Sequence, residues 1–308
     1  MRALITTGQG RLELPFAEVP DPHPRSDEVL IAVRTTSLNA GEVRRIAQEP
    51  AGTVLGWDVA GEVLEPAADG SGPAAGARVV GLVGSGAWAA RCAVPTSALA
   101  VIPDGVSDAA AATLPVAGLT AWRALEHGGL LIGHEVLVTG GAGGVGRFAI
   151  ELAAAAGARV TAVVGRPERA AGLRELGASE VVVGIENAAG PYDLVLESVG
   201  GSSLAHALEV CRPGGTVVSY GRSSHDDVVF APTWFLTHSD TRMVGLLVFD
   251  EVRARRSGSP QLQRLLQLVS DGRLHPHIDR EASWEDAAEL AGALVDRRIA
   301  GKAVLHVQ

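Results

Sequence analysis

The segment best suited to chemistry is Gly141-Ala-Gly143-Gly144-Val145-Gly146, which follows a short apolar run and precedes a helical pattern. In this context Gly141 permits a tight turn, Gly143 lets the backbone approach a pyrophosphate, and Gly146 lets the helix press against a sheet. The main-chain amides at the start of the helix then meet the phosphate charge. We therefore predict that the following residues bind a dinucleotide: Gly141, Gly143, Gly144, Val145 and Gly146.

The tip of the next strand decides between the two nicotinamide dinucleotides. An acidic residue about 20 positions after the glycines accepts hydrogen bonds from the ribose hydroxyls of NAD. This chain has Gly165 and Arg166 at that point, and Arg169 follows. Guanidinium groups pair well with a phosphate dianion, which favours the 2′-phosphate of NADPH. Glu168 opposes this charge, but on the expected helix it need not face the ribose. We predict NADPH as the cofactor, held in part by Gly165, Arg166 and Arg169.

Such a loop needs a parallel sheet, and residues 114–249 have the pattern of one. Apolar runs suited to strands alternate with helical patterns, which is typical of a parallel sheet covered on both faces. Gly157 and Gly177 stand where helix C-caps are expected. The pattern predicts a six-stranded, doubly wound Rossmann sheet. Its expected strands are 135–139, 159–164, 181–183, 194–196, 216–219 and 243–248, and its expected helices are 145–156, 168–176 and 202–211.

The remaining residues, 1–113 and 250–308, are expected to form one discontinuous domain. Short strand patterns separated by Gly/Pro-rich turns predict a β-barrel or sandwich in the first segment. Its expected strands are 3–6, 29–33, 54–63, 78–82 and 89–94. The second segment has helical patterns at 261–270 and 284–295 and a last strand at 301–305. That strand has no sheet of its own, so we predict that it packs onto the first domain.

Composition excludes several classes of protein. A chain of 308 residues favours two domains. A net charge of −9 argues against nucleic acid as a partner. The longest uncharged stretch, 109–122, is too short to span a membrane, and no secretory signal is visible. Only Cys92 and Cys211 occur, which fits a reducing compartment. We therefore expect a cytoplasmic protein without nucleic-acid or membrane partners.

With these features, the chain resembles the medium-chain dehydrogenase/reductase superfamily, and most closely its zinc-independent quinone oxidoreductase (zeta-crystallin-like) branch. The resemblance covers nearly the whole length. It implies an α/β protein with a GroES-like β-barrel domain, a Rossmann domain and a nicotinamide cleft between them. Besides the glycine loop, these segments carry it: Ser37-Leu-Asn39-Ala-Gly-Glu42, Gly56-Trp-Asp58-Val-Ala-Gly61, Ala117-Gly-Leu-Thr120-Ala, Leu176-Gly-Ala178 and Gly301-Lys302-Ala-Val-Leu.

The resemblance assigns roles in the first domain. Asn39 matches the family asparagine beside the nicotinamide ribose and the substrate, where its amide would orient an acceptor oxygen; a turn-capping role is the alternative. Glu42 stands in place of the usual aspartate and is expected to be structural. Asp58 is expected to bind backbone N–H groups rather than act as an acid. Trp57 and Trp88 would either wall the pocket or belong to the core.

Further cofactor contacts are expected in and around the Rossmann domain. The resemblance places Thr120 at the domain junction, where its hydroxyl is expected to meet the cofactor. Phe249, at the end of the sixth strand, is expected either to flank the nicotinamide or to pack between domains. Ligands bind at the carboxyl edge of such sheets. The segment after the fifth strand is therefore also predicted to contact the cofactor: Tyr220, Gly221, Arg222 and Ser223.

The chain lacks the zinc ligands of the superfamily's alcohol dehydrogenases. Residues 34–39 hold no cysteine, Trp57 replaces a histidine, and no cysteine cluster exists. We expect no metal. Oxidising an alcohol without zinc is difficult, because the alcohol is a very weak acid. Hydride transfer to a quinone or an enone instead produces a weakly basic anion, which positioning and a few dipoles can stabilise.

We therefore predict an NADPH-dependent oxidoreductase that transfers hydride to quinones or α,β-unsaturated carbonyls, with a small electron-poor molecule as acceptor. One alternative is an enoyl reductase that tailors polyketide-like intermediates. The absence of a tyrosine proton donor from the first domain weakens this alternative. A second is an NADPH-binding protein with little catalysis. The apolar sixth strand, if it forms the sheet edge, predicts a homodimer through that edge.

Overall fold

Two units divide the chain in the computed structural model, which describes residues 1–8, 10–255 and 258–307. The first unit contains Met1–Leu119 and Phe249–Gln308, and the second contains Thr120–Val248. The second is thus an insertion in the first. The first unit continues past residue 113 because the turn at Leu114–Gly118 is tied to it: the Val116 N–H donates to a carboxylate of that unit.

The first unit is built on a mostly antiparallel sheet with strand order β14-β15-β3-β4-β5-β7, in which β6 also pairs with β3. A small sheet pairs β1 with β2. The GroES-like domain predicted from the sequence is confirmed. The strands are β1 (Arg2–Leu4), β2 (Phe16–Glu18), β3 (Glu28–Leu38), β4 (Asp58–Glu65), β5 (Arg78–Leu82), β6 (Arg91–Pro95), β7 (Leu99–Val101), β14 (Ile278–Ser283) and β15 (Lys302–His306).

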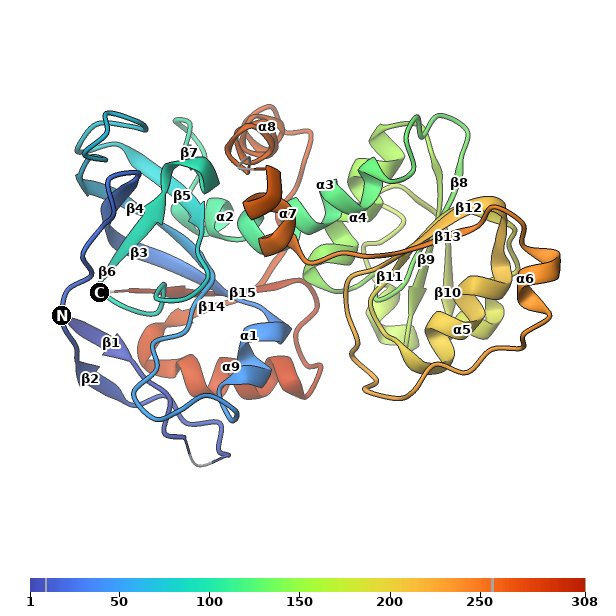
Figure 1. Ribbon diagram of the computed structural model, residues 1–308, viewed down its shortest axis with the longest axis horizontal. Coiled ribbons are helices and arrows are strands. Elements are labelled where there is room, and N and C mark those ends of the chain that lie inside the picture. The colour runs from blue at the N-terminus through green and yellow to red at the C-terminus, as the bar shows by residue number, and fades with distance from the viewer. Residues whose placement is uncertain (9, 256–257, 308) are drawn as a thin grey trace. The chain divides into compact units, whose positions relative to one another are not determined.

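The last strand returns to the first unit, as predicted. β15 pairs antiparallel with β3, with Leu38 opposite Ala303, and parallel with β14. Figure 1 shows this meeting of the two chain ends, with red strands in the same sheet as blue ones. Short helices complete the unit: α1 (Ala40–Arg45), α2 (Asp108–Ala112), α7 (Val248–Arg255), α8 (Ser259–Ser270) and α9 (Ala287–Val295).

The second unit is a parallel six-stranded sheet with strand order β10-β9-β8-β11-β12-β13. This is the Rossmann order, so the predicted doubly wound sheet is confirmed. Its central strands are buried almost throughout, which explains their continuous apolar sequences. The strands are β8 (Glu135–Val138), β9 (Arg159–Val164), β10 (Ala178–Val183), β11 (Tyr192–Glu197), β12 (Cys211–Ser219) and β13 (Arg242–Gly245).

Four α-helices are described in the second unit: α3 (Leu119–Glu126), whose first residue belongs to the first unit, α4 (Gly144–Ala155), α5 (Gly201–Val210) and α6 (Trp234–Thr237). Helix α4 ends as predicted, because Gly157 follows it with φ +87°. The helix expected at 168–176 is wrong. That stretch is a 3-10 turn, Pro167–Ala170, followed by further turns. Gly172 has φ +75°, a conformation that no α-helix continues.

The sixth strand is shorter than the sequence predicts. β13 ends at Gly245, which pairs with Ser219, the last residue of β12. Because β12 offers no further partner, the chain leaves the sheet there and enters helix α7 at Val248. Phe249 therefore lies in a helix of the first unit and not at the end of a strand, which corrects its expected place.

The described residues contain no helix that is both long enough and apolar enough to cross a membrane.

Candidate functional site

The glycine loop joins β8 to α4 with very close backbone contacts. A Cβ on Gly146 would lie 2.4 Å from the carbonyl oxygen of Gly140, and one on Gly143 would lie 3.2 Å from the same oxygen. The Gly141 N–H donates to Val163 O at 2.9 Å, which ties the loop to β9. Bare backbone is thus required where α4 begins, and the first amides of α4 have no intrahelical partner. This cradle fits the pyrophosphate of a dinucleotide.

The tip of β9 carries the two predicted arginines. Arg166 is exposed and Arg169 is half-buried, and both belong to one short turn in which the Arg169 N–H donates to Arg166 O at 3.1 Å. The turn holds one acidic residue, Glu168, which is exposed. Gly165 has open space where a Cβ would stand, so sterics do not require a glycine there. The arrangement offers guanidinium groups to an anion at the strand tip.

Sequence reasoning missed Ser198, which connects the glycine loop with the segment after β12. Its backbone N–H donates to Thr139 Oγ1 at 2.8 Å, and a Cβ on Gly140 would lie 2.6 Å from Ser198 Oγ. On the other side, a Cβ on Gly221 would lie 2.7 Å from Ser198 O, and the Ser223 N–H donates to the same oxygen at 3.3 Å. The structure therefore brings the loop and the 220–223 segment to one edge of the sheet.

Glu197, also missed, is fully buried at this edge. It accepts hydrogen bonds from the N–H groups of Val199 and Gly200 and from the Ser203 hydroxyl at 3.0 Å. These contacts fix the start of α5. The Tyr220 N–H donates to Glu197 O at 2.9 Å. Burial raises the pKa of Tyr220, so its hydroxyl keeps its proton. Glu197 ends a strand and stands three residues before the pair Gly200 and Gly201. This pattern in the sequence could have indicated the helix cap.

Three other predicted cofactor residues have different surroundings. Arg222 is exposed beside Gly221. Thr120 is buried in α3, in the second unit. Phe249 is half-buried in α7 of the first unit and packs edge-to-face on Trp57 with ring centroids 4.9 Å apart.

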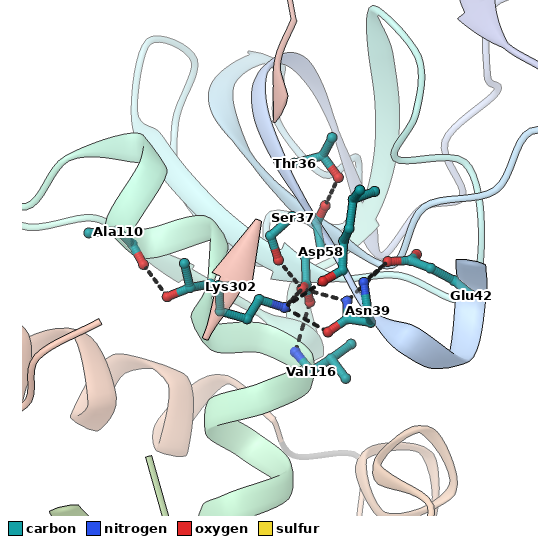
Figure 2. A network of polar contacts seen from close by, with 10 residues as sticks. Thr36, Ser37, Asn39, Glu42, Asp58, Ala110, Val116 and Lys302 are labelled. Atoms are coloured by element: carbon teal, nitrogen blue, oxygen red, sulfur yellow. Dashed lines mark hydrogen bonds and ion pairs between the residues drawn. The ribbon is translucent and has the colours of Figure 1, made fainter. Parts of the chain in front are cut away.

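Asn39 lies in a buried polar network of the first unit, which Figure 2 shows from close by. Its Nδ2 donates to Asp58 Oδ2 at 2.8 Å and to Glu42 Oε1 at 3.1 Å. Its Oδ1 accepts from Lys302 Nζ at 2.7 Å. The Asn39 N–H also donates to Glu42 Oε1 at 2.8 Å, and the two residues form a capping box at the start of α1, which agrees with the capping alternative for Asn39.

Asp58 is the centre of the network. Its Oδ1 accepts the Val116 N–H at 2.8 Å, which confirms the predicted backbone-binding role. Its Oδ2 also accepts from Ser37 Oγ and forms an ion pair with Lys302 Nζ at 3.2 Å. Both charged side chains are buried, with exposed fractions of 0% and 4%. The ion pair was not predicted, since it joins residues far apart in the chain.

The pKa of Glu42 is raised from 4.5 to about 8, and burial of the carboxyl group is the largest cause. The nearby Asp58 carboxylate raises it further, and the Lys302 ammonium and the Asn39 donors oppose the rise. Glu42 Oε2 is buried and has no hydrogen-bond partner. Glu42 is therefore largely a neutral acid at pH 7, which fits a structural role.

Trp57 is half-buried and packs closely on the start of α1, where a Cβ on Gly41 would lie 2.8 Å from its ring. Trp88 is fully buried in the core of the first unit, so for this residue the core alternative is correct. Among the described residues, no group of three or more histidine, cysteine, aspartate or glutamate side chains is placed to hold a metal ion.

Comparison with known proteins supports the fold of both units. The family of GroES-like alcohol dehydrogenase domains matches residues 25–104, and the family described as zinc-binding dehydrogenase matches residues 144–270. A chloroplast envelope quinone oxidoreductase homolog of Arabidopsis thaliana is 30% identical over 97% of this chain and 95% of its own length.

Two further similar proteins differ in how much of their own length the chain spans. A mycobacterial protein solved in complex with NADPH is 25% identical, covers 99% of this chain and 100% of its own, and superimposes with a TM-score of 0.89. One of the phenolphthiocerol/phthiocerol polyketide synthase proteins of Mycobacterium tuberculosis is 28% identical over 97% of this chain, which spans only 14% of that protein. The chain belongs to the medium-chain dehydrogenase/reductase superfamily. Within it, the chain falls in the quinone oxidoreductase branch.

Proposed function

We propose that this oxidoreductase uses NADPH to reduce quinones or α,β-unsaturated carbonyls without a metal. The observation that supports this most directly is the glycine cradle at the start of α4, followed by the Arg166 and Arg169 pair at the tip of β9, in a chain of this family. The small acceptor would be electron-poor, because the residues described here offer no strong acid or Lewis acid to activate a less reactive carbonyl.

NADPH is favoured over NADH by charge. The 2′-phosphate of NADPH would be stabilised by guanidinium groups, which also provide directed hydrogen bonds. The ribose hydroxyls of NADH would instead require a carboxylate at the tip of β9, and neither Gly165 nor Arg166 supplies one. The mycobacterial relative solved with NADPH supports the same choice.

Metal-free chemistry is supported by the residues at the positions where zinc dehydrogenases of the superfamily have ligands. Trp57 packs against Gly41 and Phe249, and its indole offers no metal-binding atom. Asp58 is occupied by Lys302, Ser37 and a backbone N–H. A reaction that generates a weakly basic product anion is the one these residues suit.

In this function the chain's own residues bind and orient. A bound NADPH supplies the hydride. The first amides of α4 would hold the pyrophosphate, and Arg166 and Arg169 would hold the 2′-phosphate. After hydride transfer to the acceptor, the anion formed, an enolate from an enone or a hydroquinone anion from a quinone, would take a proton from water. Tyr220 keeps its own proton because burial raises its pKa.

The resemblance to a polyketide synthase supports a second candidate function. An enoyl reductase that acts on an extended, carrier-bound enoyl thioester uses the same hydride chemistry on a larger acceptor. The chain is 28% identical to the synthase over 97% of its own length. The two candidates differ only in the size and attachment of the acceptor.

NADPH oxidation at 340 nm with a panel of acceptors tests both candidates. Small quinones and simple enones are expected to be reduced, with NADH a poorer donor. Turnover confined to long-chain enoyl thioesters would favour the second candidate. Tight NADPH binding without turnover of any acceptor would contradict both and leave a binding protein.

A further inference from the structure

The Asn39 carboxamide has little hydrogen-bonding capacity left for a ligand. An amide has two N–H donors and an oxygen with two lone pairs. Both donors are used, one by Glu42 and one by Asp58, and one lone pair of Oδ1 is used by Lys302. Asn39 is only half-buried, and because both of its N–H donors are occupied within the protein, a ligand that reaches it meets Oδ1 rather than a donor.

We propose that the Asn39 carboxamide is fixed as a hydrogen-bond acceptor by three positioning residues, and that one of them, Glu42, acts as a neutral acid. The other two are Asp58 and Lys302. The proposal rests on the proposed function, because it states what Asn39 offers to cofactor or acceptor. It corrects the expectation that the Asn39 amide orients an acceptor oxygen, since a carbonyl needs a donor. A ligand hydroxyl, such as that of a ribose, fits instead.

The three neighbours determine which way the amide faces. In the observed orientation, Nδ2 points to the two carboxyl groups and Oδ1 to the ammonium. Figure 2 shows the three side chains converging on Asn39 from β15, β4 and α1. A flipped amide would place N–H groups against Lys302 Nζ and its oxygen against the Asp58 carboxylate. Two donors or two acceptors that face each other in a buried site are strongly unfavourable, so the flipped orientation is suppressed.

Lys302 is unusual in this chain. It is the one lysine among 26 lysine and arginine residues. Its three N–H groups have three acceptors: Leu38 O at 3.2 Å, Asn39 Oδ1 at 2.7 Å and Asp58 Oδ2 at 3.2 Å. A compact ammonium can serve acceptors in three directions, whereas the planar guanidinium of arginine is larger and directs its donors in one plane. The site therefore requires lysine where the rest of the chain uses arginine.

The contacts of Glu42 fit a neutral acid. Its side chain is fully buried, Oε1 accepts two N–H bonds from Asn39, and Oε2 has no partner. The charged groups that act on it are Asp58 from β4 and Lys302 from β15, and the Lys302 N–H groups all go elsewhere. Lys302 thus acts on both carboxyl groups by its charge, but it is hydrogen-bonded to Asp58 and not to Glu42. A second buried negative charge would be uncompensated, so the proton stays on Glu42 at Oε2.

Selective isotope labelling can follow the network directly. Protein grown with [15N]lysine gives one side-chain signal, Lys302 Nζ. In the wild type this signal is expected to shift once as the pH rises through about 8, when Glu42 ionises. The isosteric Glu42→Gln variant keeps a carbonyl oxygen for Asn39 and is expected to show no such shift. Coincident titrations in the two proteins would overturn the neutral-acid assignment.

Labelled asparagine tests the acceptor orientation. The chain has two asparagines, Asn39 and Asn187, and an Asn187→Ser variant assigns the signals. The Asn39 Nδ2 hydrogens are expected to resist solvent exchange both in the free protein and with saturating NADPH. Loss of that protection on adding NADPH would show the N–H groups turning to the ligand and would overturn the proposal. The lysine titration and the exchange of the Asn39 hydrogens in the free protein need no ligand. An unprotected Asn39 Nδ2 in the free protein would therefore overturn the fixed orientation even if NADPH fails to bind.

Stability and activity provide a second readout. Glu42 has a raised pKa in the folded state, so its contribution to stability is present below pH 4.5 and is lost as the pH rises to about 8. The melting temperature of Glu42→Gln relative to wild type is therefore expected to increase across that window. At pH 7 the variant is expected to keep turnover within about threefold, whereas Lys302→Met loses about tenfold or more. Inactivity of a folded Glu42→Gln protein would contradict the neutral-acid role.

Discussion

At the scale of single residues, we expect the choice of dinucleotide to depend on a few side chains at the tip of β9. Arg166 and Arg169 lie on one turn, and the adjoining Gly165 has open space around it. A guanidinium stays charged at any physiological pH and can bind a phosphate through two hydrogen bonds. Preference for NADPH should therefore depend on these two residues and be largely independent of pH.

Changing Arg166 and Arg169 together to Ala is expected to weaken NADPH binding about tenfold or more, as for lost charge-assisted hydrogen bonds. NADH binding should change little, because NADH lacks the 2′-phosphate. Isothermal titration calorimetry with both dinucleotides measures the difference. Arg174→Ala is the matched control, since Arg174 is an exposed arginine of the same unit that donates to Ser179 O and is not among the predicted cofactor residues. Equal losses for NADPH and NADH in the double variant would contradict the phosphate assignment.

The residues of the site could be predicted well where their pattern is local in the sequence. They could be predicted poorly where the interacting residues are far apart in the chain. The glycines of the loop and the arginines of β9 follow a strand at fixed spacing, so their neighbourhood could be anticipated. The Lys302–Asp58 ion pair joins strands at opposite ends of the chain. Spacing carries no information about that pairing, although a lysine inside the apolar pattern of β15 was a usable signal.

At the scale of elements, the close contact between α4 and the glycine loop leads to a testable prediction. Gly146→Ala places a Cβ 2.4 Å from Gly140 O and 2.7 Å from Gly141 Cα, so the helix or the loop must move. Binding of either dinucleotide is expected to fall about tenfold or more, because the amides lose their alignment. Gly84→Ala is the control: a Cβ there meets open space, Gly84 is not among the predicted cofactor residues, and binding should stay near wild type. Equal affinities for the two variants, measured by calorimetry, would show that the cradle does not hold the ligand.

Elements were predictable where burial imposes a repeating pattern. The central strands of the second unit are apolar throughout, and their positions agree with the prediction to within a few residues. The expected helix at 168–176 failed because its apolar spacing suggested a helix that Gly172 interrupts. The sixth strand was predicted too long, because the apolar run 243–249 continues beyond the end of the partner strand β12. The number of residues over which a strand pairs depends on the length of the neighbouring strand. The local sequence of β13 does not show where β12 ends.

At the scale of the whole molecule, the second sheet has an edge strand that carries exposed apolar side chains. β13 is the last strand of that sheet and pairs only with β12 among the described residues. Met243 on β13 and Leu247 just after it are more than half exposed, and Phe235 and Leu236 of α6 are exposed as well. Apolar edge strands are usually covered. We propose that a second copy of the chain covers this edge.

Light scattering tests this assembly. The wild type is expected at twice the chain mass of 31.7 kDa, and Met243→Lys is expected at the monomer mass, because a charge on the edge opposes pairing. Leu64→Lys, an exposed apolar position on β4 of the first unit, is the control and should stay dimeric. A monomeric wild type at micromolar concentration would contradict the proposal.

The discontinuous first unit has a consequence for biosynthesis. All six strands of the inserted sheet have left the ribosome before β15 is made, so the inserted unit can mature first, against the usual N-to-C order. Until the final residues emerge, β3 lacks its β15 neighbour and Asp58 lacks its ammonium. A nascent chain cut short before Lys302 would therefore have a complete second unit but a first unit with an unpaired strand edge and a buried carboxylate without its cation.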